Sequence, residues 1–141
     1  MSDFELINHY FSYGIDEMRV YSEESFNKNY QNFDLSYYQA FNKDLQSFPD
    51  FDLRKHYHLL GKNEDRIINL STFDDKNPQF NNKFYRNFNK DLESFSDFEL
   101  RKHYFYFGQN ESRITNGKVF HEFYPKFKVD IYKKIIKIYN I

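Results

Sequence analysis

Residues 49–67 read PDFDLRKHYHLLGKNEDRI, and the same pattern stands at two other places in the chain. Its counterparts are SDFELINHYFSYGIDEMRV at residues 2–20 and SDFELRKHYFYFGQNESRI at residues 96–114, so the three segments begin 47 residues apart. Equal spacing without a gap indicates an internal repeat, in which each unit buries its apolar face by stacking on its neighbours.

The stretch that begins at Phe33 supplies the other half of the repeat. FDLSYYQAFNKDLQSF at residues 33–48 matches FNNKFYRNFNKDLESF at residues 80–95, and the more divergent FKVDIYKKIIKIYNI at residues 127–141 keeps Phe127 and Tyr132 in register. We therefore predict one helical-repeat domain over residues 1–141, with three circularly permuted 47-residue units. Its expected parts are the end of a unit at 1–32, full units at 33–79 and 80–126, and the start of a unit at 127–141.

Each unit is predicted to contain two helices, which makes the fold all-α. The first runs from about Leu35 to Leu45, with apolar residues on one face and Asp34 as the N-cap. Pro49 suits the first turn of the second helix in the middle copy. In the other copies a capping box starts that helix, because a serine stands three residues before a glutamate: Ser2 and Glu5, Ser96 and Glu99.

A glycine ends each second helix, and we expect it to adopt the left-handed closing conformation. These glycines are Gly14, Gly61 and Gly108. A polar turn follows, with a glutamate and an arginine two residues apart, and then a connector for which a further short helix or none is predicted. The recurring arginines are Arg19, Arg66 and Arg113.

The composition narrows the classes of function. Lys plus Arg number 20 against 21 for Asp plus Glu, so no charge imbalance favours nucleic acid or an anionic membrane as the partner. The absence of cysteine excludes a disulfide framework, a thiolate zinc site and a cysteine nucleophile. The 18 Phe and 13 Tyr let a short chain build a core, and we expect most of them to be buried.

The pattern FD-x-x-YY, then N-x-D-L, then HY-x-x-x-G-x-x-E-x-R, from Phe33 to Arg66, resembles a short helical repeat of bacterial and giant-virus proteins. There it is appended to glycosyltransferases or strung along large surface proteins. The resemblance covers nearly the whole chain and implies an accessory, non-catalytic element with no catalytic residues to carry over. Together with the wealth of Phe, Asn and Lys, it favours a giant virus as the source.

The recurring histidines admit two interpretations. His9, His56 and His103 would form a metal site only if three repeated helices pointed them at one axis. We favour the structural interpretation, in which each bonds a carboxylate or carbonyl, and we expect no metal and no cofactor. His58 and His121 have no repeated partner and are predicted to lie on the surface.

The recurring arginines also have two interpretations. Arg19, Arg66 and Arg113 form either a row that binds anions or sugars, or structural groups that close the glycine turn on a carbonyl or carboxylate. The second is favoured. No paired carboxylates, nucleophile with a neighbouring histidine or glycine-rich phosphate loop is evident, so we predict that the chain is not an enzyme.

A structural or protein-interaction module is therefore the leading functional hypothesis, with a carbohydrate-binding accessory module as the alternative. We expect a protein partner or self-association, with a glycan as the other candidate, and neither nucleic acid nor membrane. The N-terminal MSDFELINHYF lacks the features of a secretory signal, which favours a cytoplasmic or virion location.

The predicted ends of the repeat suggest one further contact. Residues 1–32 hold the second helix of a unit and residues 127–141 hold the first helix, so each has what the other lacks. We expect the C-terminal helix to pack against the N-terminal one, either within a chain or head to tail between chains.

Overall fold

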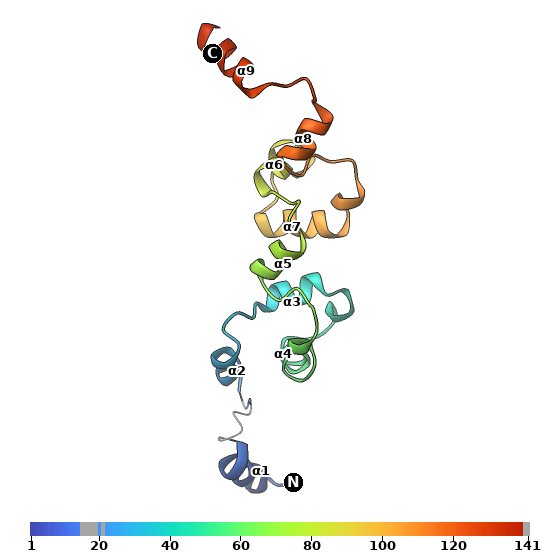
Figure 1. Ribbon diagram of the computed structural model, residues 1–141. Coiled ribbons are helices and arrows are strands. Elements are labelled where there is room, and N and C mark those ends of the chain that lie inside the picture. Colours follow the sequence, from blue (N-terminus) through green and yellow to red (C-terminus); the bar gives the residue numbers. More distant parts are fainter. Residues whose placement is uncertain (15–19, 21, 140–141) are drawn as a thin grey trace. The chain divides into compact units, whose positions relative to one another are not determined.

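The structure is a computed structural model that describes residues 1–14, 20 and 22–139. In that part of the chain it holds nine α-helices, with short 3-10 segments and one π-helical segment beside them, and no strand (Figure 1). The all-α prediction is confirmed.

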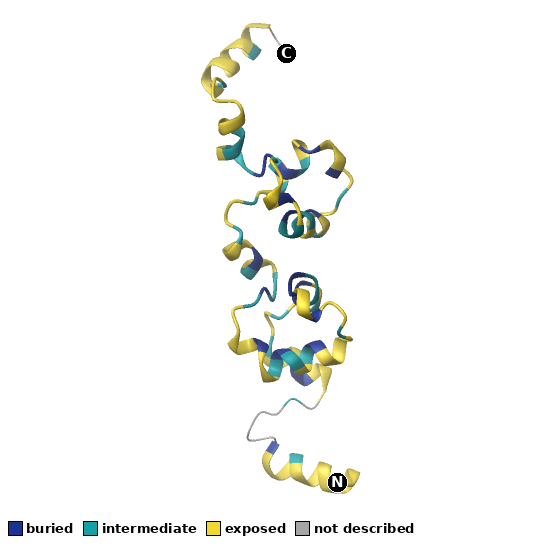
Figure 2. Cartoon of the chain, turned by 90° about the vertical axis from the view of Figure 1, so that its right-hand side faces the viewer, coloured by how far each residue is buried: buried dark blue, intermediate teal, exposed yellow. Residues whose placement is uncertain are grey.

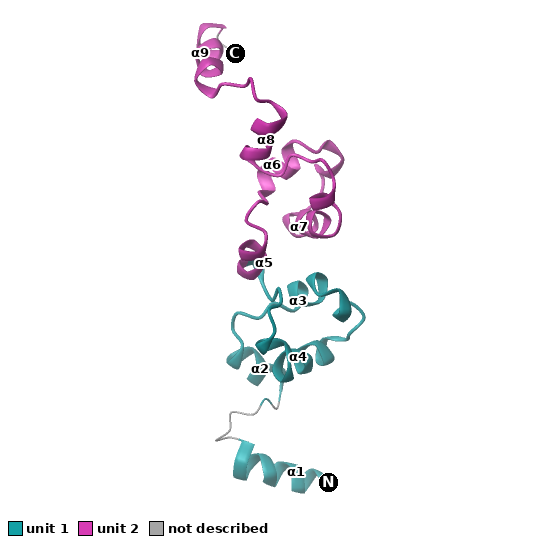
Figure 3. Ribbon diagram, turned by 45° about the vertical axis from the view of Figure 1, so that its right-hand side comes forward, with its two compact units in different colours: residues 1–70 teal, residues 71–141 magenta. Residues whose placement is uncertain are grey.

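The chain divides into two compact units, Met1–Leu70 and Ser71–Ile141 (Figure 3). The helices up to residue 70 are α1 Asp3–His9, α2 Glu23–Asn29, α3 Leu35–Phe41 and α4 Asp50–Leu59. Those that follow are α5 Leu70–Lys76, α6 Asn82–Asn87, α7 Asp97–Tyr106, α8 Gly117–Phe123 and α9 Val129–Tyr139.

The core of the first unit lies among α2, α3 and α4. Aromatic and leucine side chains fill it, because a short chain gains most apolar burial from large residues. Its buried members are Phe26, Tyr38, Leu45, Leu53 and Tyr57.

The second unit buries the same residue types 47 positions later. These are Phe73, Tyr85, Leu92, Leu100 and Tyr104. Figure 2 colours the buried residues of both units dark blue. The sequence period therefore recurs in the burial of individual side chains.

The predicted helix over residues 35–45 is interrupted at Asn42. Its backbone adopts φ −119° and ψ 96°, so α3 ends at Phe41 and a separate 3-10 turn covers Lys43–Leu45. The cause is the Asn42 side chain, whose Nδ2 donates to the carbonyl oxygens of Tyr38 at 2.8 Å and Ile67 at 2.9 Å. An asparagine that bonds distant backbone competes with helix propagation.

The predicted helix starts are confirmed where the signal is local. Asp34 caps α3, since its Oδ1 accepts from the backbone amides of Ser36 and Tyr37. Both capping boxes form, at the starts of α1 and α7. Pro49 occupies the N-cap position of α4 rather than its first turn.

The connectors contain helices, which settles the question left open by the sequence. α2, α5 and α8 each hold one of the recurring connector phenylalanines, Phe26, Phe73 and Phe120. The C-terminal segment, whose residues partly alternate as in a strand, is helical in α9.

None of the helices formed by the described residues is long and apolar enough to cross a lipid bilayer.

Candidate functional site

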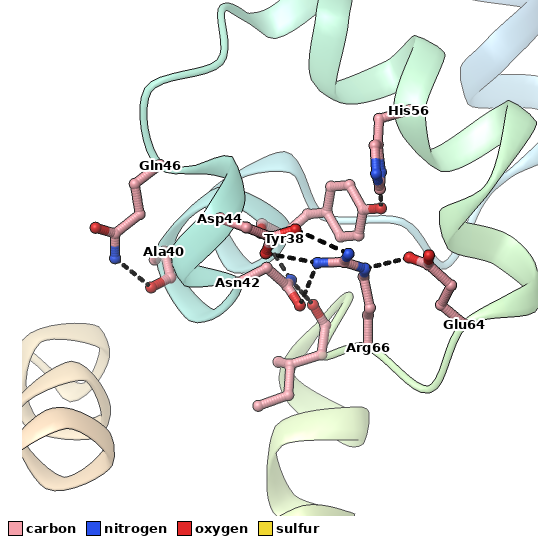
Figure 4. Close-up of polar contacts among 9 residues, drawn as sticks. Tyr38, Ala40, Asn42, Asp44, Gln46, His56, Glu64 and Arg66 are labelled. Atoms are coloured by element: carbon pink, nitrogen blue, oxygen red, sulfur yellow. Dashed lines mark hydrogen bonds and ion pairs between the residues drawn. The ribbon is translucent and has the colours of Figure 1, made fainter.

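A tyrosine–histidine hydrogen bond joins the two main helices of each unit. The Tyr38 hydroxyl on α3 and Nδ1 of His56 on α4 are 2.8 Å apart, as Figure 4 shows. The hydroxyl of Tyr85 and Nδ1 of His103 repeat this contact at 2.8 Å. The expectation that these histidines bond a carboxylate or a carbonyl was wrong, because Nδ1 of each bonds a buried tyrosine hydroxyl instead.

The glycine that follows the second helix of each pair, α4 or α7, leaves space for the same tyrosine. A Cβ on Gly61 would lie 1.9 Å from Tyr38 Oη, and one on Gly108 would lie 1.8 Å from Tyr85 Oη. None of Gly14, Gly61 and Gly108 has the positive φ of a left-handed closing residue, so that expectation was wrong for all three. At Gly61 and Gly108 glycine is needed because any side chain would collide with the phenol hydroxyl.

Burial makes these phenols weaker acids. Loss of solvation raises the pKa of Tyr38 to about 12, and the same cause raises the pKa of Tyr85 to about 12. A phenol with so high a pKa is almost entirely neutral near pH 7, so it is a poor nucleophile or general base there. The Tyr–His pairs are therefore suited to a structural role.

The recurring arginines bind carboxylates of their own unit. Arg66 donates from Nη1 and Nη2 to the two carboxylate oxygens of Asp44, at 2.8 and 2.9 Å, and it also pairs with Glu64 (Figure 4). Arg113 holds Asp91 in the same two-pronged way, at 2.9 and 2.9 Å, and pairs with Glu111. These contacts match the structural interpretation of the arginines.

The ion pairs shift the ionisation of both partners. Hydrogen bonds from Arg66 lower the pKa of Asp44, and hydrogen bonds from Arg113 lower the pKa of Asp91. The hydrogen bond with Asp44 also raises the pKa of Arg66. Arg66 and Arg113 thus stay charged and bound to carboxylates over the whole physiological range.

Arg19 lies outside the described residues. The row of ligand-binding arginines stays a prediction, and a ligand at Arg66 or Arg113 would first have to displace two carboxylates.

The other histidines differ in their surroundings. His58 is half-buried, and its Nδ1 lies 2.7 Å from the hydroxyl of Tyr30, where burial lowers its pKa. His58 is thus partly covered rather than fully exposed, whereas His121 is exposed as expected. Within residues 1–14, 20 and 22–139, no cluster of three or more His, Asp or Glu side chains could hold a metal ion.

An apolar groove of about 610 Å³ lies between α2 and α4. Phe26, Phe51 and Leu59 form much of its lining, and Arg54 crosses it to donate to Glu23 at 2.7 Å.

A smaller recess of about 280 Å³ in the second unit is polar. Arg101, Asn82 and Asp74 line it. Oδ1 of Asn82 and Nε of Arg101 are buried without a hydrogen-bond partner. Nε of its counterpart Arg54 is unpartnered as well, but Nη2 of Arg54 donates to Glu23. The recess thus holds an unpartnered asparagine oxygen at a position where the first unit has Leu35.

The helices α1 and α9 carry the most continuous exposed apolar side chains. Neither helix has a buried residue, and Figure 2 shows both as mostly exposed. Phe4 and Ile7 of α1 are 77% and 67% exposed, and Ile138 of α9 is 75% exposed. Apolar side chains gathered on exposed helices mark surfaces that bind other molecules.

Sequence reasoning missed two kinds of tyrosine–histidine contact. The first is Tyr38 with His56, which recurs as Tyr85 with His103, and the second is Tyr30 with His58. A signal for the first was present, because a tyrosine stands 18 residues before the repeated histidine in both complete copies. The second has no repeated counterpart, since phenylalanine replaces His58 at position 105.

Comparison with protein-family models, with curated proteins and with solved structures finds no match to this chain.

Proposed function

We propose that this chain is a non-catalytic structural module that works by binding protein, built from helical units that repeat every 47 residues. The observation that carries the proposal is the contrast between its repeated polar residues and its exposed helices. The repeated histidines and arginines of the two complete copies form hydrogen bonds and ion pairs inside their own unit. Helices α1 and α9, in contrast, present apolar side chains to solvent.

The repeated residues of the two complete copies support a structural role because each has a partner that explains it. Tyr38 uses the hydrogen-bonding capacity of His56, and its hydroxyl explains Gly61. Asp44 and Glu64 occupy the guanidinium of Arg66. The same partners recur 47 residues later in the second unit.

The exposed helices support binding of protein rather than of a small molecule. A convex helix surface gives no enclosure for a small ligand, which usually needs a concave pocket. An amphipathic helix instead binds by laying its apolar face against another protein surface. The acidic first turn of α1 and the lysines of α9 would add polar rims to such contacts.

A photo-cross-linking amino acid in place of Phe4 or Ile138 tests this proposal in the cells that make the chain. We expect adducts with a defined set of proteins from both positions, identified by mass spectrometry. The control carries the same amino acid at Lys62, which is exposed on a polar turn. Adducts that are absent, or that are the same from Lys62, would contradict the proposal.

Carbohydrate binding is the second candidate, and the polar recess beside Asn82 favours it. Arg101 offers donors, Asp74 offers acceptors, and the two charges balance, which suits a neutral ligand rich in hydroxyl groups. The first unit has Leu35 in place of Asn82 and pairs the equivalent arginine with Glu23. Only the second unit would bind such a ligand.

A glycan array tests this second candidate with the full chain. Binding should be lost in Asn82→Leu, which installs the residue of the first unit, and kept in Lys83→Leu, which changes an exposed neighbour outside the recess. An array without a bound glycan, or equal binding by both variants, would exclude the recess as a saccharide site.

A further inference from the structure

The two complete helix pairs define what each of their helices needs. A helix of the first kind, α3 or α6, supplies a tyrosine that is 0% exposed in both units. A helix of the second kind, α4 or α7, supplies the histidine that bonds this tyrosine and a leucine that is also 0% exposed. The tyrosines are Tyr38 and Tyr85, the histidines His56 and His103, and the leucines Leu53 and Leu100.

Helix α9 has the features of a first helix, but its tyrosine has no histidine. The rings of Phe127 and Tyr132 lie 5.6 Å apart, close to the 5.1 Å of Phe33 and Tyr38 in the first unit. The residues before α9 and within it therefore arrange this aromatic pair as the complete units do. Tyr132 nevertheless remains 52% exposed, and no described residue forms a hydrogen bond with its hydroxyl.

Helix α1 has the features of a second helix, but its histidine has no tyrosine of the first kind. Leu6 stands at the position of Leu53 and is 53% exposed instead of 0%. His9 is exposed and contacts the ring of Tyr13, a residue of its own segment. No described tyrosine hydroxyl bonds His9, which is what Tyr38 provides for His56.

The charges of α1 and α9 also correspond to a known pair. In the second unit Arg86 of α6 forms an ion pair with Asp97 of α7. The corresponding residues are Lys133 on α9 and Asp3 on α1. A lysine and an aspartate thus stand where one complete unit has an attractive contact between its two helices.

Helix α9 departs from the complete units in one respect. Ile136 and Ile138 replace the asparagine and aspartate that bind the repeated arginine in the other copies. The substitution extends the apolar surface of α9, so burial of these isoleucines would add to the contact that Tyr132 makes.

We infer that α9 of one copy binds α1 of a second copy and so rebuilds the tyrosine–histidine helix pair between chains. This inference rests on the proposed protein-binding function and names its partner, a second copy of this chain. Tyr132 of one copy bonds His9 of the next, Leu6 is covered, and Lys133 faces Asp3. Because the two binding surfaces differ, each added copy leaves one of each open and the contact is head to tail.

Mixing two blocked variants of the full chain tests the inference directly. Leu6→Glu blocks α1 and Tyr132→Glu blocks α9, and both residues are exposed, so each variant keeps its fold. Light scattering should show that the mass of the unmodified chain rises with concentration, while each variant alone stays monomeric. An equimolar mixture should give a dimer and nothing larger, because only one pair of compatible surfaces remains.

A milder variant separates the specific hydrogen bond from non-specific apolar association. Tyr132→Phe keeps the ring and removes the hydroxyl, and it should weaken association roughly 2- to 10-fold, the effect of one net hydrogen bond. The matched control, Tyr124→Phe, removes the hydroxyl of an equally exposed tyrosine outside α9 and should leave association unchanged.

Three results would overturn the inference: a monomer at every concentration, assembly by either blocked variant alone, or a mixture that stays monomeric. A monomer whose α1 and α9 protect each other from hydrogen exchange would replace it with closure inside one chain. Photo-cross-links from Phe4 or Ile138 to other proteins would still support the proposed function, so the two failures are distinguishable.

Discussion

The hydroxyl oxygen of Tyr38 fills the space that a side chain at residue 61 would need. A Cβ on Gly61 would lie 1.9 Å from this oxygen, and the hydroxyl is held there by its hydrogen bond with His56. Three residues from α3, α4 and the turn after α4 therefore depend on one another. Because the geometry recurs at Tyr85, His103 and Gly108, each effect can be measured twice in one chain.

Gly61→Ala should destabilise the first unit by about 1–3 kcal/mol, the usual cost of forcing extra volume into a packed site. Urea unfolding followed by circular dichroism measures this change. Gly117→Ala is the control, because its Cβ would meet Phe84 Cζ at an ordinary 3.4 Å at the start of α8. The control should leave stability unchanged or raise it by up to about 1 kcal/mol through helix propensity.

Tyr38→Phe should cost about 0.5–1.5 kcal/mol, because it removes the hydrogen bond with His56. The same substitution should relieve the collision in Gly61→Ala, since the colliding oxygen is gone. A double-mutant cycle should therefore show that the two changes together cost less than their sum. Additive effects would mean that Gly61 is required for another reason.

Alkaline titration should reveal a group of buried tyrosines that ionise late. Burial raises the pKa values of Tyr38, Tyr57, Tyr85 and Tyr104. The pKa values of Tyr38 and Tyr85 rise to about 12, above the ordinary value of about 10. The neutral phenols stabilise the folded chain fully below pH 10, and this contribution is lost as the pH rises toward 12. Tyrosinate absorbance and helical circular dichroism should change together in this interval, and Tyr38→Phe should remove one late tyrosine.

Acid should weaken the units through their aspartates. Hydrogen bonds from arginine hold the pKa values of Asp44 and Asp91 below the ordinary value of about 3.9. Their stabilising contribution is present above about pH 4 and is lost as the pH falls through the lower folded-state values. The double variant Asp44→Asn with Asp91→Asn should be less stable than the unmodified chain at neutral pH, and this difference should vanish in strong acid. A constant difference at every pH would show that these carboxylates contribute no ionisation-linked stability.

The sequence predicted helix starts well because their signals are local. Asp34 bonds amides two and three residues ahead, and Ser96 with Glu99 forms a closed pair within one turn. Such contacts depend on few backbone angles, so residue type and spacing are enough to predict them.

The sequence was less informative where a side chain reaches across the unit. The predicted helix ran through Asn42 to Leu45, yet the amide of Asn42 bonds the carbonyl of Ile67 and ends α3. Gly61 fitted a left-handed helix end, yet its role is to leave space for Tyr38. Both errors have one cause, since the deciding partner lies more than 20 residues away.

The amino-acid sequence by itself determined the 47-residue period, the helical character of the chain and the recurrence of His, Gly and Arg at fixed positions. It did so because a repeat is visible as equal spacing of like residues, and helix caps depend only on residues within one turn of each other. Only the tertiary structure decided what those residues do: the histidine bonds a tyrosine, the glycine accommodates its hydroxyl, and the arginine holds an aspartate. These roles arise when packing brings distant side chains to within hydrogen-bonding distance, and spacing along the chain does not encode which partner arrives.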